Sequence, residues 1–308
     1  MHVVLLGTAA GGGFPQWNCR CPVCSVARRH PGRARPRTES SAAVSADGAH
    51  WFLLNASPDV RAQLGWLADG SRPHDGATPA ARHTPVEGVV LTDAELDHSL
   101  GVVLLREARQ LTLYATHAVR STLECDSRLL PTTRAFADVS VTDLPCGEPV
   151  ELRRRDGAAS GLTVEAFPVP GDPPRFVSAD EPGHTVGLIV RDVATGGSLA
   201  FVPGCGELDD VVLDRLHRAD AVLFDGTFWD DDELRTLGVS ERTARAIGHV
   251  PIAGPDGSLG RLASLPARTR VYTHINNTNP ILLEDSLERR QVRDARVEVG
   301  ADGMRFTL

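Results

Sequence analysis

The sequence has no long apolar run. No stretch approaches the roughly 20 consecutive apolar residues that a membrane-spanning helix needs, so we expect no insertion into a membrane. The apolar N-terminal run, residues 1–6, carries no basic segment ahead of it and indicates a first strand, not a signal peptide. We therefore expect a cytoplasmic protein.

An excess of basic charge is also missing. The chain has 32 basic and 40 acidic residues, a formal net charge of −8, which disfavours nucleic-acid binding through phosphate contacts. A secreted disulfide scaffold would be smaller and denser in cysteine, whereas three of the six cysteines here crowd into residues 19–24. The pattern favours a reduced compartment and one metal-binding knot.

Internal repeats and long low-complexity segments are absent as well. The glycine-rich residues 7–13 lack the Gly-x-Gly-x-x-Gly order of a dinucleotide site, so they indicate a tight turn. The apolar fraction of 42% suits a sizeable core, and 308 residues fit one large β-rich unit. We therefore expect a single domain over residues 1–308, with the cysteine knot near its N-terminus.

Short apolar runs bounded by turn residues predict buried strands at 3–6, 51–54, 88–91, 111–114, 162–167, 186–190, 199–202, 221–225 and 270–274. Helices are expected over 99–108, 209–217 and 243–248, and a further helix is expected to begin at Ser57-Pro58-Asp59. Turn signals predict hairpins over 186–202 and 296–307, while 70–85 and 168–183 indicate irregular loops. Strands separated by helices in both halves predict a layered α/β sandwich.

Acidic residues and one histidine follow the strand expected at 88–91: Asp93, Glu95, Asp97 and His98. Carboxylates combined with imidazole suit divalent zinc, iron or manganese. The alternative is a helix N-terminus whose solvated acids favour the helix dipole. Two other expected strands end at Asp225 and His274, and ligands that converge from distant strand ends are typical of open metal sites. The sequence therefore favours a metal centre.

A second site is indicated by Cys19-x-Cys21-x-x-Cys24. Three thiolates this close favour a shared soft metal, for which zinc is the default. A chance cluster or a redox trio is the alternative. A closed zinc site needs a fourth ligand, and the residues alone leave His30, water or another group open for that place.

The spacing Asp93-x-Glu95-x-Asp97-His98 resembles the His-x-His-x-Asp-His signature of the metallo-β-lactamase superfamily, with acids in place of the two leading histidines. His274 resembles the superfamily's late histidine, Asp225-Gly-Thr its late strand end, and Gly248-His249 the Gly-His of phosphodiesterase-like members. His184 falls roughly where a third histidine occurs. The resemblance implies an αββα sandwich of two mixed β-sheets flanked by helices.

The departures from that signature bear on the number of metals. The bridging aspartate of the superfamily would fall near residues 201–204, where this chain has no acid. We therefore expect one metal, with Asp97, His98 and His274 as core ligands and Asp93 as a fourth ligand or as a residue that orients one. Phosphonate-pathway phosphodiesterases that share the cysteine cluster have a histidine three residues after the late histidine. Asn277 stands there in this chain, which makes it a candidate fourth zinc ligand.

Distinctive strings at residues 6–19, 55–64, 96–98, 222–229 and 274–282 are similar to the pyrroloquinoline quinone (PQQ) biosynthesis protein B family. The resemblance spans the whole chain and implies a role in making PQQ from a Glu and a Tyr of a precursor peptide. Three interpretations follow: an iron-dependent hydroxylase of the tyrosine ring, a superfamily hydrolase, or a non-catalytic carrier in the transport of PQQ or its precursor.

The first interpretation is the one we favour, because one open metal with histidine and carboxylate ligands fits non-haem Fe(II) oxygenases, although zinc or manganese also fits the residues. Glu95 would orient a ligand or act as a base. His249 and Asp225 would bind the amino-acid backbone or move protons. The expected partners are the Glu–Tyr-derived intermediate and other proteins of the pathway. The sequence leaves the oligomeric state open, a homodimer being one expectation.

Overall fold

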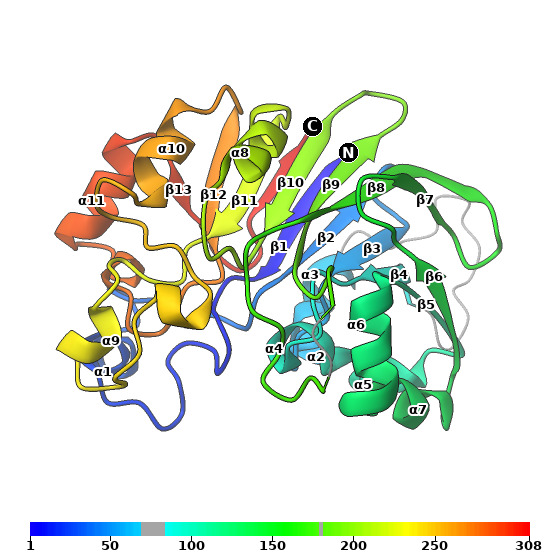
Figure 1. Ribbon diagram of the computed structural model, residues 1–308, viewed down its shortest axis with the longest axis horizontal. Coiled ribbons are helices and arrows are strands. Elements are labelled where there is room, and N and C mark those ends of the chain that lie inside the picture. Colours follow the sequence, from blue (N-terminus) through cyan, green and yellow to red (C-terminus); the bar gives the residue numbers. More distant parts are fainter. Residues whose placement is uncertain (69–83, 179–180) are drawn as a thin grey trace.

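The computed structural model describes residues 1–68, 84–178 and 181–308 and arranges them as two seven-stranded sheets (Figure 1). The loop expected at 70–85 lies almost wholly outside the described residues. The first sheet has the order β14 (Arg305–Thr307), β1 (His2–Gly7), β2 (Ser41–Ser45), β3 (Trp51–Leu54), β4 (Val86–Val90), β5 (Gln110–Ala115) and β6 (Asp138–Asp143). The second has the order β13 (Glu298–Val299), β12 (Thr269–Thr273), β11 (Ala221–Asp225), β10 (Ser198–Val202), β9 (Val186–Asp192), β8 (Ala159–Pro168) and β7 (Pro149–Arg153).

Both sheets are mixed. Strands β3 to β6 run parallel, while β14, β1, β2 and β3 pair antiparallel. In the second sheet β10 to β13 are parallel, and β7 to β10 pair antiparallel. Carboxyl ends of parallel strands are where open sheets place their sites, and the segments after β4, β11 and β12 carry the predicted site residues.

The main core lies between the sheets and follows the two-residue period of the strands. In β1, Val3 and Leu5 belong to the core between the sheets, and Val4 and Leu6 belong to the core beneath the helices. Continuous apolar runs of this kind are expected for strands covered on both faces. The predicted αββα sandwich of two mixed sheets is therefore confirmed.

Helices cover the outer face of each sheet (Figure 1). The first sheet is covered by α2 (Val60–Gln63), α3 (Gly65–Ala68), α5 (Gly101–Leu104), α6 (His117–Ser121), a π-helical turn (Thr122–Asp126) and α7 (Leu129–Arg134). The second is covered by α1 (Pro22–Arg29), α8 (Asp210–His217), α10 (Ser258–Ser264) and α11 (Leu287–Asp294). Among the described residues, no helix has the length and apolar character needed to cross a membrane.

The remaining helical segments are short and lie around the loops: α4 (Leu96–Ser99), α9 (Glu233–Thr236) and 3₁₀ turns at Leu105–Glu107, Arg245–Ile247 and Pro280–Leu282. The helix expected over 99–108 is thus three short pieces that begin at Leu96. The helix expected over 243–248 is only the 3₁₀ turn Arg245–Ile247.

The two predicted hairpins have different outcomes. The hairpin over 186–202 is confirmed, because β9 and β10 pair antiparallel. The hairpin over 296–307 is wrong: β13 pairs with β12 in one sheet, and β14 pairs with β1 in the other. Asp302 explains the difference, since its carboxylate accepts hydrogen bonds from the Thr8 hydroxyl at 2.8 Å and the Thr38 amide at 2.7 Å. These contacts fix the turn that carries Asp302 against the segments that carry Thr8 and Thr38.

Candidate metal centre

Asp93 lies in the turn between β4 and α4 and contacts His98. The two Asp93 oxygens are 2.8 and 2.9 Å from Nδ1 of His98, and they also accept hydrogen bonds from the Thr92 hydroxyl and the Glu95 amide. Both oxygens are therefore engaged by protein donors. Asp93 thus contacts the ring of His98 at Nδ1.

Asp97, His98 and His274 form a cluster at the base of a pocket. One ligand atom from each lies within 4.8 Å of the others. Nε2 of His274 is 3.2 Å from an Asp97 oxygen, and Nε2 of His98 is 3.9 Å from the same oxygen. Nε2 of His98 is buried and has no hydrogen-bond partner among the residues described. A buried nitrogen left without a partner fits a metal ligand.

The charges around His98 favour a cation. Burial alone would lower the pKa of His98, but the carboxylates of Asp93 and Asp97 outweigh it and raise that pKa to about 10. Burial and the neighbouring His98 hold the pKa of His274 below its usual range. His274 therefore stays neutral, the form in which imidazole binds a metal. The site stabilises positive charge, whether a proton or a metal ion supplies it.

A second group of polar residues follows β11 and reaches His249. The Asp225 carboxylate lies 2.7 Å from Nδ1 of His249 and accepts hydrogen bonds from the Cys205 amide and from the amide and hydroxyl of Thr227. Asp225 is fully buried and does not line the pocket. One of its oxygens lies within 4.8 Å of ligand atoms of His249 and His274, and the carboxylate is also engaged by these donors.

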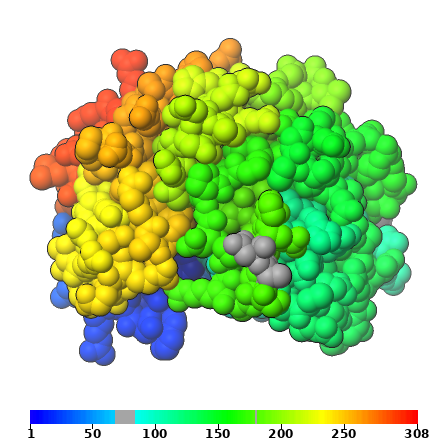
Figure 2. Space-filling model, viewed as in Figure 1, coloured from blue at the N-terminus to red at the C-terminus, as the bar shows by residue number. Residues whose placement is uncertain are grey.

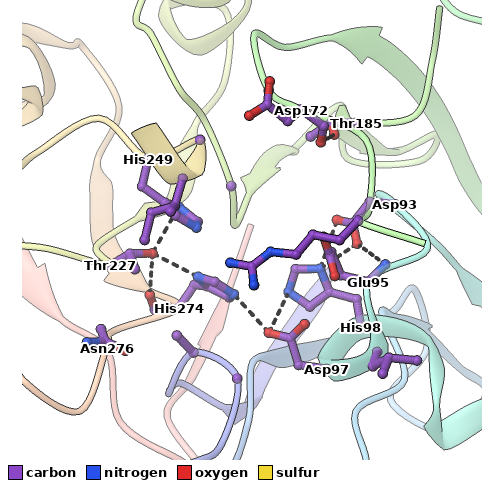
Figure 3. Close-up of a pocket in the computed structure, with 18 of the residues that line it drawn as sticks. Asp93, Glu95, Asp97, His98, Asp172, Thr185, Thr227, His249, His274 and Asn276 are labelled. Carbon is purple, nitrogen blue, oxygen red and sulfur yellow. Dashed lines mark hydrogen bonds and ion pairs between the residues drawn. The ribbon is translucent and has the colours of Figure 1, made fainter. Parts of the chain in front are cut away.

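Thr227 is a site residue that the sequence reasoning did not single out. Its hydroxyl lies 2.8 Å from Nδ1 of His274 and 3.1 Å from Nδ1 of His249. The His249 and His274 rings stack, with centroids 5.3 Å apart (Figure 3). Three imidazoles are thus fixed at Nδ1, by Asp93, Thr227 and Asp225. This arrangement sets the orientation of metal-binding histidines in many proteins.

Close backbone approach explains the glycines around this cluster. A Cβ added to Gly11 would lie 3.2 Å from an Asp97 oxygen, so the glycine-rich turn lets the backbone reach the site. Gly204 lines the pocket. It belongs to the segment, residues 201–204, where the superfamily has its bridging aspartate and this chain has no acid. The amide of the next residue, Cys205, donates to the Asp225 carboxylate at 2.9 Å.

The pocket has a cavity of about 770 Å³. Figure 2 shows its mouth as a hollow between the yellow and green parts of the chain, with dark blue N-terminal atoms at the base. Asp172 and Thr185 lie across the cavity from Asp97 and His274 (Figure 3). The loop expected at 168–183 therefore contributes one wall. His184 is buried beside it but does not line the cavity.

Glu95 and Glu39 line the pocket, and their carboxylates make no hydrogen bond to the histidines among the described residues. Partial burial, with Asp93 and Asp97 nearby, raises the pKa of Glu95 to about 7. Glu39, which the sequence reasoning missed, accepts a hydrogen bond from the Gly12 amide at 2.7 Å. Burial, with Asp97 close by, raises its pKa to about 7 despite that hydrogen bond. No sequence signal marks Glu39, because it reaches the pocket from the segment before β2.

Cys19, Cys21 and Cys24 converge at the start of α1, with their sulfurs within 4.8 Å of one another. The side-chain amide of Asn277 lies 3.3 Å from the Cys24 sulfur, and the Asn277 carbonyl accepts from the Cys21 and Cys24 thiols. The hydrogen bonds from Cys21 and Asn277 lower the pKa of Cys24 to about 7 although burial opposes the shift. His30, at the end of α1, does not belong to this group.

Comparison with known proteins gives consistent matches. Residues 50–275 match the family model of the β-lactamase superfamily domain. The chain is 42% and 44% identical to coenzyme PQQ synthesis protein B of Methylobacterium radiotolerans and of Methylobacterium nodulans, with both chains covered completely. The crystal structure of zinc-bound PqqB from Methylobacterium extorquens superposes with a TM-score of 0.87 at 39% identity over 100% of both chains. A diphosphatase of the PhnP family, at 20% identity and a TM-score of 0.66 over 100% of this chain and 97% of its own, shares the fold.

Proposed function

The chain belongs to the coenzyme PQQ synthesis protein B family, and on that premise we propose that it is an iron-dependent hydroxylase of the tyrosine ring in a Glu–Tyr-derived intermediate. The observation that carries the proposal is the Asp97, His98 and His274 cluster at the base of an open pocket. Two imidazoles and one carboxylate are the donor set of non-haem iron oxygenases, which keep positions open for O₂ and substrate. Bound iron(II) would supply the activation of O₂.

The ring reaction sets the demands on the protein. One oxygen atom of O₂ enters the ring and the other leaves as water, which consumes two electrons and two protons from a reductant. A phenolate ring is richer in electrons than a phenol, so a base near the hydroxyl favours the reaction. Although burial opposes the shift, the Asp225 carboxylate raises the pKa of His249 and contacts its Nδ1, so the neutral ring would accept the phenol proton at Nε2. Glu95 is the second candidate, since a base works best with a pKa near the working pH.

The hydrolase interpretation lacks support in the site. Hydrolysis by two metals needs the ions about 3.5–4 Å apart, a spacing that the superfamily's bridging aspartate would set. Gly204 stands at the wall of the pocket where the chain lacks the bridging acid. A carrier would bind the product without turnover and would not need a metal with open positions.

The test of the proposed function is a single reaction series. Protein loaded anaerobically with Fe(II) would be mixed with L-glutamyl-L-tyrosine, ascorbate and O₂, and the product analysed by mass spectrometry. We expect the ring to gain one oxygen atom. We expect no such gain with Zn(II) in place of iron or with His98→Ala. His217→Ala, on the exposed face of α8, is the matched control and should react normally. An iron-loaded wild type that leaves the ring unchanged would exclude the hydroxylase.

We also propose that Cys19, Cys21 and Cys24 hold a structural zinc that the Asn277 side chain completes. Three sulfurs within 4.8 Å of one another suit a tetrahedral zinc site. The oxygen and nitrogen of an asparagine amide are assigned from hydrogen bonding, so either orientation of Asn277 is compatible with its position. The zinc-bound relative supports zinc as a metal of this family.

A further inference from the structure

Two arginines line the pocket and form no ion pair with a described residue. Arg175 comes from the loop after β8 and makes no hydrogen bond or ion pair with any described residue, although its charge partly offsets the raised pKa of Glu95 in the same pocket. Arg242 comes from the loop before His249, and its guanidinium donates only to the backbone carbonyl of Ala246 within the described part of the chain. Other arginines of the described residues do form ion pairs, as Arg155 does with Glu87 at 3.3 Å. Unpaired guanidinium groups at a pocket indicate an anionic ligand.

The same pocket holds an acceptor that lacks a donor. Oε1 of Glu39 is anchored by the Gly12 amide, whereas Oε2 is buried and has no hydrogen-bond partner among the described residues. A buried carboxylate oxygen left without a partner is costly, so it favours a ligand that brings a donor. Glu39 lines the cavity together with the metal cluster. The pocket therefore offers two cationic groups and one oriented anionic acceptor beyond the predicted metal ligands.

We propose that Arg175 and Arg242 bind the carboxylates, and Glu39 the ammonium group, of a zwitterionic amino acid or dipeptide whose side chain reaches the metal cluster. This inference rests on the proposed function. Guanidinium groups recognise carboxylates through paired hydrogen bonds, and a carboxylate recognises an ammonium through its charge. L-Glutamyl-L-tyrosine has two carboxylates and one ammonium, which matches this set. A phosphodiester would use the arginines but would give Glu39 no donor.

The test measures binding without turnover. Full-length protein loaded with Zn(II), which does not reduce O₂, would be titrated by calorimetry with L-glutamyl-L-tyrosine, its C-terminal amide and its N-acetyl derivative. Arg175→Gln and Arg242→Gln should each weaken dipeptide binding about tenfold, the effect of losing one charged hydrogen bond. The affinity for the C-terminal amide should be unchanged by at least one of the two arginine substitutions. Arg261→Gln, an exposed arginine of α10 outside the pocket, is the matched control.

The acidic side of the pocket has its own test. Glu39→Gln keeps the shape of the side chain and the acceptor for Gly12, but it should weaken dipeptide binding about tenfold and leave binding of the N-acetyl derivative unchanged. Thermal melting of each variant would show that the fold is retained. Arginine variants that bind the dipeptide as wild type does would overturn the proposal. Inorganic phosphate would be titrated in parallel. Arginine variants that lose phosphate binding but keep dipeptide binding would also overturn the proposal.

The two proposals fail in different ways. If the arginine variants lose dipeptide binding but the iron-loaded wild type leaves the ring unoxidised, the binding pocket stands and the hydroxylase fails. If the wild type oxidises the ring and the variants bind normally, the hydroxylase stands and the assigned contacts fail.

Discussion

At the scale of single residues, the site is defined by what holds each imidazole. His98, His249 and His274 are each fixed at Nδ1, by Asp93, Asp225 and Thr227 respectively. A ring fixed at one nitrogen presents the other in a set direction, so less ordering entropy is lost when a metal binds. We therefore expect Asp93 to contribute to metal affinity through His98.

Replacing Asp93 by Asn should weaken the metal without abolishing its site. The amide keeps a hydrogen bond to His98 but loses the charge that favours a cation there. We expect affinity to fall by roughly 10- to 100-fold, the usual effect of losing a residue that orients a ligand. Competition with a chelator would measure it. Glu95→Gln is the control, and a similar loss of affinity in that variant would contradict the assigned roles.

Glu233 offers a pH test away from the metal cluster. It is buried and accepts hydrogen bonds from the Trp229 amide and the Thr278 hydroxyl, yet burial raises its pKa from 4.5 to about 7. The folded protein binds this proton more tightly than the unfolded chain. The stability that this group contributes is therefore full below pH 4.5 and is lost as the pH rises through about 7.

Glu233→Gln cannot ionise and should escape that loss. The free energy of unfolding of the variant minus that of the wild type should be larger at pH 8 than at pH 5 by about 2 kcal/mol. Urea denaturation at the two pH values would measure the difference. An equal effect of the substitution at both pH values would show that Glu233 titrates normally in the folded protein.

At the scale of elements, one short segment joins the two predicted metal sites. It leaves β12 at His274, whose φ of 54° turns the chain, and Asn277 reaches the cysteines three residues later. The Ile275 amide and carbonyl bond the backbone of Thr8 and Ala10, which fixes the segment to the glycine-rich turn. The position of His274 thus depends on the same segment that carries Asn277.

The fourth zinc ligand can be tested on this segment. Asn277→His should hold zinc more tightly than wild type, because imidazole completes a three-cysteine site better than an amide. Asn277→Ala should lose zinc more readily. Zinc release to a chromogenic chelator would be followed, with Asn279→Ala as a variant of a nearby asparagine that bonds only backbone and does not touch the sulfurs. If Asn277→Ala retained zinc as wild type does, Asn277 would not be a ligand.

The same scale shows why sequence reasoning found some elements and missed others. Apolar runs such as Ala221–Asp225 and Trp51–Leu54 were predicted at their observed bounds, since burial on both faces leaves a clear pattern. The C-terminal hairpin was wrong because its turn chemistry is local, whereas the side-chain contacts of Asp302 with Thr8 and Thr38 are not.

The site shows the same division. Asp97, His98 and His274 follow from a motif and from strand ends, and the structure brings them together. Glu39 and Thr227 were missed as site residues because their roles come from packing between distant segments. Asp225 is predicted as a catalytic residue; it is fully buried and contacts Nδ1 of His249, so we expect it to act through that ring.

At the scale of the whole molecule, two sheets form a rigid base for a site built from loops. Leu223 of β11 is fully buried between the sheets, directly before the segment that carries Asp225 and Thr227. Leu223→Ala should lower the free energy of unfolding by about 2–5 kcal/mol through the cavity it leaves. Urea unfolding would measure this, and Leu287→Ala, 64% exposed on α11, should change stability by less than about 0.5 kcal/mol. Equal effects of the two variants would contradict the assigned core.

The number of active-site metals tests the central claim most directly, because a single open metal separates the proposed hydroxylase from a two-metal hydrolase. Protein that carries zinc at the cysteine site alone would be titrated anaerobically with Fe(II), and bound iron would be counted by elemental analysis after removal of free metal. One equivalent of iron per chain in the wild type, and none in His98→Ala, is the predicted result. Two equivalents in the wild type, or one retained in His98→Ala, would contradict the single metal held by Asp97, His98 and His274.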